Sequence, residues 1–343
     1  YRMYKMKVFS KNRLTSEYLC AIIGTSKTFT PSTERKTNMK KLLAFTLAAL
    51  MAVGCIFTLA SCKKNSSELK VVDIPLTEEK YAFAVQKGDS EMLGKLNDFL
   101  AKIQSNGTFN EIMNKYFGDG KPAPVASAAT MKTDGSQLIV ATNATFEPFE
   151  YLEGANYYGI DMEIMSLFAA ELGKELYINN MDFDAVCLSV SAAGGTYEDE
   201  NGQVKTVSGG TCDVAAAGLT VTETRKESLD FSSTYYSASQ MIIVAKDDTT
   251  FDNCKTKEDV EAILNGYDKS VKVGVQNGTT GKTYCVGDAG VEGGFGFAGF
   301  KFETVGYTSG AVAAQNIKTG NIKMVVIDEG PAKAIVAKIN AAG

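Results

Sequence analysis

The chain has 343 residues, with 35 Lys and Arg against 40 Asp and Glu, and it contains no His and no Trp. The lack of His excludes His-based catalytic triads, imidazole metal ligands and imidazole pH switches. Residues 62–343 carry 25 basic and 38 acidic residues, a net charge of −13. This charge disfavours nucleic acid and anionic lipid headgroups as partners. A folded part of about 280 residues is long enough for two domains or lobes.

The first feature along the chain is a complete export signal that begins at Met39. A short basic run is followed by an apolar stretch over residues 42–60, and the sequence Leu-Ala-Ser-Cys stands at residues 59–62. This order is typical of a secretory signal peptide. We expect residues 39–61 to be the signal peptide and residues 1–38 to be upstream sequence outside the native protein. A membrane-spanning helix is the alternative, because about 20 apolar residues can cross a bilayer.

The tetrapeptide at residues 59–62 resembles the lipobox of bacterial lipoproteins. In that class the cysteine receives lipid and becomes the first residue of the mature protein. The resemblance implies that Cys62 is the lipid anchor and that residues 62–68 are the anchor and its tether. It also implies an extracytoplasmic location on the bacterial membrane, at the cell surface or in a periplasm.

Four further cysteines follow the anchor, at Cys187, Cys212, Cys254 and Cys285. An even number of cysteines in an exported chain favours disulfides, and three pairings are open. A Cys187–Cys212 bond would close the polar loop over residues 192–210. Four free buried thiols are the alternative. None of the spacings is Cys-x-x-Cys, so we expect no zinc site.

Two strands and two helices are predicted directly after the tether. They are expected, in order, at 69–74, 81–85, 91–105 and 110–116. Ser90 is placed to cap the first of the two helices, and Asn106-Gly107 is placed to end it. Residues 119–137 begin with Pro and Ala and show no core-forming pattern, which predicts a linker.

Strands and helices alternate after the linker. The predicted strands are 138–142, 214–217, 240–245, 271–275 and 324–327, and the predicted helices are 161–172, 183–190, 257–264, 309–318 and 331–339. Such alternation predicts an α/β fold of parallel sheets with helices on both faces. Ligands of these folds bind in a crevice at the carboxyl ends of the strands.

The residues at these strand ends form several short motifs. They stand at 140–150, 159–164, 217–226, 229–236, 273–281 and 324–328. Together they resemble the polar amino-acid-binding (solute-binding) proteins of bacterial ABC importers, and the resemblance extends over nearly all of residues 68–343. It implies a two-lobed type II periplasmic-binding-protein fold, often called a Venus flytrap, that closes on its ligand.

The order of the segments departs from that family. The segment that resembles 69–118 comes last in the family but first here, so the chain resembles a circular permutant. The implied parts are lobe 2 at 69–80 and 246–343, lobe 1 at 81–118 and 138–245, hinge strands near 81–85 and 241–245, and a linker at 119–137 that joins the original ends. A gene fragment placed upstream by an assembly error is the alternative.

The expected site follows from the chemistry of a free amino acid. The carboxylate requires a planar double donor, which is Arg225, and the ammonium requires a buried carboxylate, which is Asp328. Threonine hydroxyls and backbone N–H groups are expected to add further contacts to the carboxylate, and aromatic rings are expected to pack against the ligand side chain. The expected substrate-binding residues are Asn143, Phe146, Phe183, Gly218, Thr220, Arg225, Thr279, Thr280 and Asp328. In the family, residues at these matching positions contact ligand, although several relatives have an acid where this chain has Asn143.

The resemblance implies a monomeric binding protein that captures an amino acid by hinge closure and delivers it to the membrane subunits of an ABC importer. We expect no catalytic residue, no metal and no cofactor. A dehydratase-like cleft enzyme with Glu150 and Asp328 as acid and base, or a sensor ectodomain, are the alternatives. A nucleotide-binding P-loop is excluded, because Gln276 stands where that motif requires Gly.

Overall fold

The computed structural model describes residues 68–199, 201–290 and 294–342. They lie within one compact unit, Lys64–Gly343. The expected leader at 1–38, the signal peptide at 39–61 and the lipid anchor Cys62 lie outside the described residues. No helix within the described ranges is long and apolar enough to cross a bilayer.

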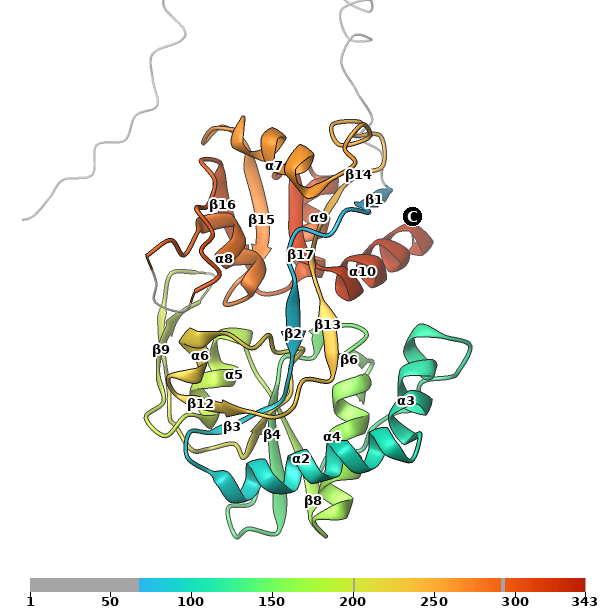
Figure 1. Ribbon diagram of the computed structural model, residues 1–343, viewed down its shortest axis with the longest axis vertical. Coiled ribbons are helices and arrows are strands. Elements are labelled where there is room, and N and C mark those ends of the chain that lie inside the picture. Colours follow the sequence, from blue (N-terminus) through green and yellow to red (C-terminus); the bar gives the residue numbers. More distant parts are fainter. Residues whose placement is uncertain (1–67, 200, 291–293, 343) are drawn as a thin grey trace, which may run out of the picture. The chain divides into compact units, whose positions relative to one another are not determined.

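Two five-stranded sheets organise this unit (Figure 1). Lobe 1 is built on the order β12 (Leu229–Phe231), β3 (Ala84–Gln86), β11 (Val214–Ala215), β4 (Gln137–Thr142) and β8 (Glu175–Asn180). Lobe 2 is built on the order β1 (Leu69–Val72), β14 (Gln240–Ala245), β17 (Met324–Asp328), β15 (Lys272–Gln276) and β16 (Glu303–Tyr307). The strands β11, β4 and β8 are parallel, as are β17, β15 and β16. The strands β1, β14, β3 and β12 add antiparallel pairs that strand-helix alternation did not predict.

Helices cover the apolar strands of both sheets, as expected for strands that are buried on both faces. Lobe 1 carries α2 (Ser90–Ser105), α3 (Thr108–Phe117), α4 (Ile160–Glu171), α5 (Phe183–Val190) and α6 (Glu223–Lys226). Lobe 2 carries α7 (Lys257–Asn265), α8 (Thr280–Val286), α9 (Gly310–Lys318) and α10 (Glu329–Ala342). The predicted helices are therefore present, with ends that shift by a few residues. Asp89, not Ser90, caps α2 by accepting from Met92 N at 3.0 Å.

Two crossing strands connect the lobes. The first reaches the predicted segment near 81–85 at Tyr81, and the second lies before the predicted segment 241–245. β2 (Glu79–Tyr81) pairs antiparallel with β13 (Tyr236–Ala238), and the pair runs between the two sheets in Figure 1. Hinge strands were expected near 81–85 and 241–245. Residues 240–245 instead form a sheet strand of lobe 2, because the apolar run is buried between β1 and β17. The lobe boundary consequently falls before this strand.

Small sheets were also missed from the sequence. β5 (Thr145–Phe146), β6 (Glu150–Glu153) and β7 (Asn156–Tyr158) form a three-stranded sheet, and β9 (Gly195–Glu198) pairs with β10 (Val204–Val207) as a hairpin. The hairpin lies in the polar loop that the Cys187–Cys212 bond was expected to close.

The disulfide prediction is not met. Cys187, Cys212, Cys254 and Cys285 are free thiols in the structure. Cys212 lies in the apolar core of lobe 1 and Cys285 in that of lobe 2. They fill space as small apolar residues, which is the alternative that the sequence left open.

The two ends of the described chain are joined by side-chain contacts. Near the end of α10, Asn340 Oδ1 accepts from Leu69 N at 2.8 Å, and Asn340 Nδ2 donates to Leu69 O at 2.9 Å. The residues between α3 and β4 run along lobe 1, where Val125 N donates to Tyr157 O and Ala128 N donates to Leu176 O. This placement is compatible with a permuted order, since α10 ends next to the strand that would follow it.

Candidate functional site between the lobes

The expected ligand residues meet where the carboxyl ends of the two sheets face each other. Asn143 and Phe146 follow β4, Phe183 begins α5, and Gly218, Thr220 and Arg225 follow β11, all in lobe 1. Thr279 and Thr280 follow β15, and Asp328 ends β17, all in lobe 2. The lobes touch directly, because Gln276 Nε2 donates to Asn143 Oδ1 at 3.0 Å.

Arg225 is anchored at the lobe interface by backbone acceptors. Thr222 caps the short helix α6 by accepting from Arg225 N at 3.1 Å. The guanidinium donates to Thr220 O at 2.7 Å and, across the lobes, to Gly278 O at 3.2 Å. It lies 5.5 Å from the ring centroid of Phe183, a cation–π contact. Two of its five donors are thus engaged, and further donors remain for an anion.

Asp328 is a buried carboxyl, 3% exposed. Tyr81 of the crossing strand donates to Asp328 Oδ1 at 2.6 Å. Among the described residues, no ion pair involves Asp328. Burial, followed by the nearby charge of Glu79, raises its pKa from 3.8 to about 7. A buried carboxyl without a cation is costly as an anion, so it favours a cationic partner or a proton.

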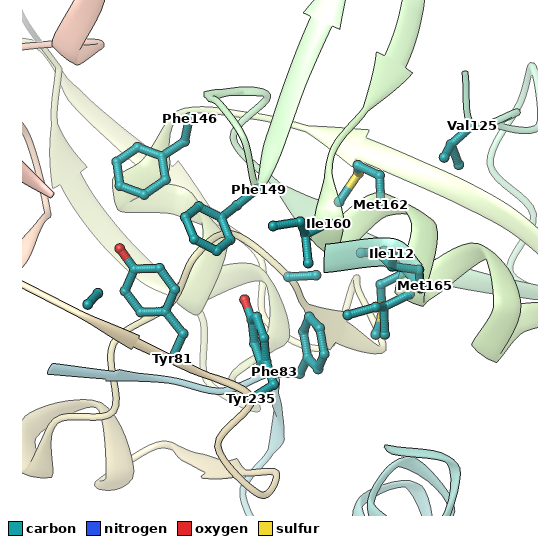
Figure 2. Packing of buried hydrophobic residues seen from close by; sticks show 14 of the residues in the cluster. Tyr81, Phe83, Ile112, Val125, Phe146, Phe149, Ile160, Met162, Met165 and Tyr235 are labelled. Carbon is teal, nitrogen blue, oxygen red and sulfur yellow. The ribbon is translucent and has the colours of Figure 1, made fainter. Parts of the chain in front are cut away.

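Tyr81, which donates to Asp328, packs into the aromatic cluster of lobe 1. Figure 2 shows its ring beside Phe149, with Tyr235 beside Phe83. Tyr81 packs edge-on against Phe149 with ring centroids 5.0 Å apart, and Phe83 stacks on Tyr235 at 4.6 Å. Tyr235 donates in turn to Asp161 Oδ1 at 2.6 Å. Each phenol therefore holds one buried carboxyl.

Asp161 supports the glycine of the site. Its Oδ2 accepts from Gly218 N at 2.9 Å, and burial raises its pKa to about 7. Gly218 has a positive φ of 50°, and a Cβ there would lie 2.9 Å from the Phe146 ring. A side chain at this position would thus be strained and would displace the expected aromatic platform.

Glu150 is a second unpaired acid nearby. It is 0% exposed, and neither carboxylate oxygen has a hydrogen-bond partner. Burial, with the charges of Asp161 and Asp328, raises its pKa well above the ordinary value. The site is consequently rich in buried carboxyls.

Side chains of other expected ligand residues are also engaged by the protein, among them the hydroxyl of Thr220, which donates to Glu79 Oε2 at 2.7 Å. Asn143 donates to Met181 O and accepts from Thr145 and Gln276. Thr279 caps α8, and its hydroxyl donates to Gln276 O at 2.8 Å. The hydroxyl of Thr280 donates to Glu79 Oε2 at 2.7 Å. These side chains help to build the site. The hydrogen-bond donors and acceptors that they have left determine what each can offer a ligand.

Sequence reasoning missed Glu79. It stands in a polar run, Thr77-Glu78-Glu79, that carries no motif. The structure places it at the start of β2, 3% exposed, with four hydrogen-bond donors around its carboxylate. Its place at the start of a lobe-crossing strand is the signal that could have singled it out.

The hairpin β9–β10 borders a small pocket beside the site. The pocket is lined from lobe 1 by Asp182, Phe183, Asp184, Tyr197 and Asp199, and from lobe 2 by Asn277 and Thr308. Tyr197 holds the hairpin to α5 by donating to Asp182 Oδ2 at 2.8 Å. The hairpin therefore closes one side of the lobe interface.

Two α/β lobes, two crossing strands and a site at facing strand ends define a type II periplasmic-binding-protein fold. The family described as bacterial extracellular solute-binding proteins, family 3, matches residues 5–119, 138–193 and 197–289. These matches cover more than half of the chain, and the chain belongs to this family.

Several known proteins are similar to parts of the chain. The arginine-binding extracellular protein ArtP of Bacillus subtilis (strain 168) is 34% identical over 111 residues, which are 32% of this chain and 37% of that protein. A probable histidine-binding protein of Neisseria gonorrhoeae is 28% identical over 165 residues, 48% of this chain and 50% of that protein. The chain thus spans about one third to one half of the length of these relatives.

A solved structure of an ancestral arginine-binding protein bound to arginine is also similar. It shares 30% sequence identity with a TM-score of 0.45, over 61% of this chain and 76% of that chain.

The buried acids predict an unusual pH dependence of stability. Because the folded-state pKa values of Asp161 and Asp328 are raised to about 7, the folded protein holds protons that the unfolded chain releases above about pH 4. Their contribution to stability is therefore greatest below about pH 4 and is lost as the pH rises to about 7. Urea unfolding without ligand should show this fall, and Asp328→Asn should make it shallower. The exposed substitution Asp119→Asn is the control, and equal slopes in all three proteins would contradict the assignment.

Proposed function

We propose that this protein captures a free amino acid between its lobes by hinge closure. The observation that carries the proposal is the pair of opposite charges contributed by opposite lobes: Arg225, with donors to spare, and Asp328, buried without a cation. An α-carboxylate suits the first group and an α-ammonium suits the second. A ligand that bridges both groups would favour the closed lobes.

The relatives support the ligand class. Two of them are named as an arginine-binding protein and a probable histidine-binding protein. We therefore propose arginine and histidine as the first candidates in a thermal-shift screen of all the amino acids. The expected result is a rise in melting temperature for one amino acid or a small group of them.

Export and delivery are part of the same proposal. We propose that Cys62 anchors the protein by lipid outside the cytoplasm, and that the closed form passes its ligand to the membrane subunits of an ABC importer. The crossing strands β2 and β13 would act as the hinge, since they form the two passages between the sheets in the described part of the chain.

A cleft enzyme is less well supported. Acid–base catalysis requires one group that donates a proton and another that accepts it, with separated pKa values. Burial raises the pKa of both Glu150 and Asp328, so their surroundings shift the two groups in the same direction and do not mark one as the acid and the other as the base. Formation of product during long incubation with the best ligand would overturn this preference.

Removing the guanidinium should abolish tight capture. Arg225→Ala is expected to weaken binding of the best amino acid by about 2–5 kcal/mol, because it removes the proposed partner of the ligand carboxylate. Lys226→Ala removes the neighbouring charge, whose partner is Glu223 on the surface, and should leave binding unaltered. Calorimetry is the measurement, and equal affinity in the Arg225→Ala protein would refute the role of Arg225.

The permuted order makes its own prediction. A rearranged gene in which residues 138–343 precede residues 69–118 would restore the order of the family. Because Leu69 and Asn340 already contact each other, a short link there should not strain the fold. The rearranged protein should unfold cooperatively and bind the same amino acid with similar affinity. A rearranged protein that fails to fold would contradict the permutation.

A further inference from the structure

The carboxylate of Glu79 lies at the centre of the lobe interface. Its Oε1 accepts from Thr77 Oγ1 at 2.7 Å and from Gln240 Nε2 at 3.0 Å. Its Oε2 accepts from Thr220 Oγ1 and from Thr280 Oγ1, each at 2.7 Å. No ion pair involves Glu79 in the described part of the chain. The charge is thus held by four neutral donors.

The two donors on Oε2 come from different lobes. Thr220 follows β11 of lobe 1, and Thr280 begins α8 of lobe 2. Glu79 itself begins the crossing strand β2. Separation of the lobes moves Thr220 away from Thr280, so at least one of the two bonds to this oxygen must break when the site opens. Hydrogen bonds to a charged acceptor are stronger than neutral ones.

The same two bonds decide how the hydroxyls face a ligand. A threonine hydroxyl has one proton and two lone pairs. When the proton is given to Glu79, the hydroxyl can only accept from a ligand. The Thr280 hydroxyl already accepts from Gln240 Nε2 at 3.2 Å, which leaves one lone pair there for a ligand. Thr220 and Thr280 therefore suit a ligand ammonium, and the carboxylate is left to Arg225 and backbone N–H groups.

We propose that Glu79 is a positioning residue that clasps the two lobes in the ligand-free protein and turns the hydroxyls of Thr220 and Thr280 into acceptors. The clasp stabilises the closed form before any ligand arrives. The second part of this proposal, the orientation of the hydroxyls, rests on the proposed function, because it concerns the ammonium group of the bound amino acid.

Ligand-free small-angle X-ray scattering of the exported chain tests the clasp. Glu79→Gln keeps the size of the side chain and removes its charge, and Thr280→Val keeps the shape and removes one donor. Both should raise the open fraction by about tenfold, the effect of about 1.4 kcal/mol lost from charge-assisted hydrogen bonds. Thr280→Ser, which restores the hydroxyl, should behave as the wild type.

The matched control is Lys80→Gln, the next residue of the same crossing strand. Lys80 is exposed, and its amino group donates to Ser237 on the paired strand β13. The control should leave the scattering unchanged. Superimposable curves for the wild type, Glu79→Gln and Thr280→Val would overturn the clasp. If Glu79→Gln does not fold, the comparison of Thr280→Val with Thr280→Ser decides alone.

Binding of two analogues tests the orientation of the hydroxyls. One analogue of the best amino acid lacks the α-carboxylate, and the other lacks the α-ammonium. Glu79→Gln should weaken binding of the first relative to the second by about tenfold, because an amide can donate to the hydroxyls and release their protons. An unchanged ratio would overturn the orientation. The scattering needs no ligand, so a wild type that binds no amino acid would refute the proposed function and leave the clasp measurable.

Discussion

The burial of carboxyl groups without cations is the constraint on which the site depends. When the carboxyl ends of two sheets face each other, Asp328 from lobe 2 and Glu79 from the crossing strand come to lie among side chains of both lobes. Water cannot solvate these groups there, so each requires protein donors, a proton or a ligand cation. Asp328 accepts a hydrogen bond from Tyr81, and Glu79 accepts from four neutral donors. For Asp328, whose partners are the Tyr81 phenol, the Gln240 side chain and backbone, a ligand ammonium is the natural further partner.

This constraint also explains why the crossing strands carry more than a connection. Glu79 and Tyr81 stand two residues apart on β2, so both face the same side of the strand toward the interface. Lys80 between them faces outward and is exposed. The crossing strand β2 thus connects the lobes and also carries Glu79 and Tyr81, whose hydrogen bonds depend on whether the lobes are closed. Arg225, which donates to backbone in both lobes, adds a further bond that opening must break.

Much of the fold could be predicted from the sequence, because long apolar runs such as β4 and β17 are buried strands whatever surrounds them. The positions of Arg225, Thr220, Thr280 and Asp328 after successive strands followed from the rule that such ends converge. The second hinge strand was misplaced because an apolar run such as 240–245 suits a hinge strand and a sheet strand equally. Its pairing with β1 and β17 places it in the sheet of lobe 2. Glu79 was missed because its importance comes from partners about 140 and 200 residues away in the chain. The prediction of disulfides was not met for a similar reason. An even number of cysteines does not show whether they form disulfides or pack as free thiols in the apolar cores.

Recognition of both poles of a free amino acid is the central claim, and one titration tests it most directly. The best-binding amino acid, its α-amide and its N-acetyl derivative are compared by calorimetry on the same protein. Because each blocked form leaves one buried polar group of the site without its partner, both should bind at least about a hundredfold more weakly. A blocked form that binds as tightly as the parent amino acid would contradict the account.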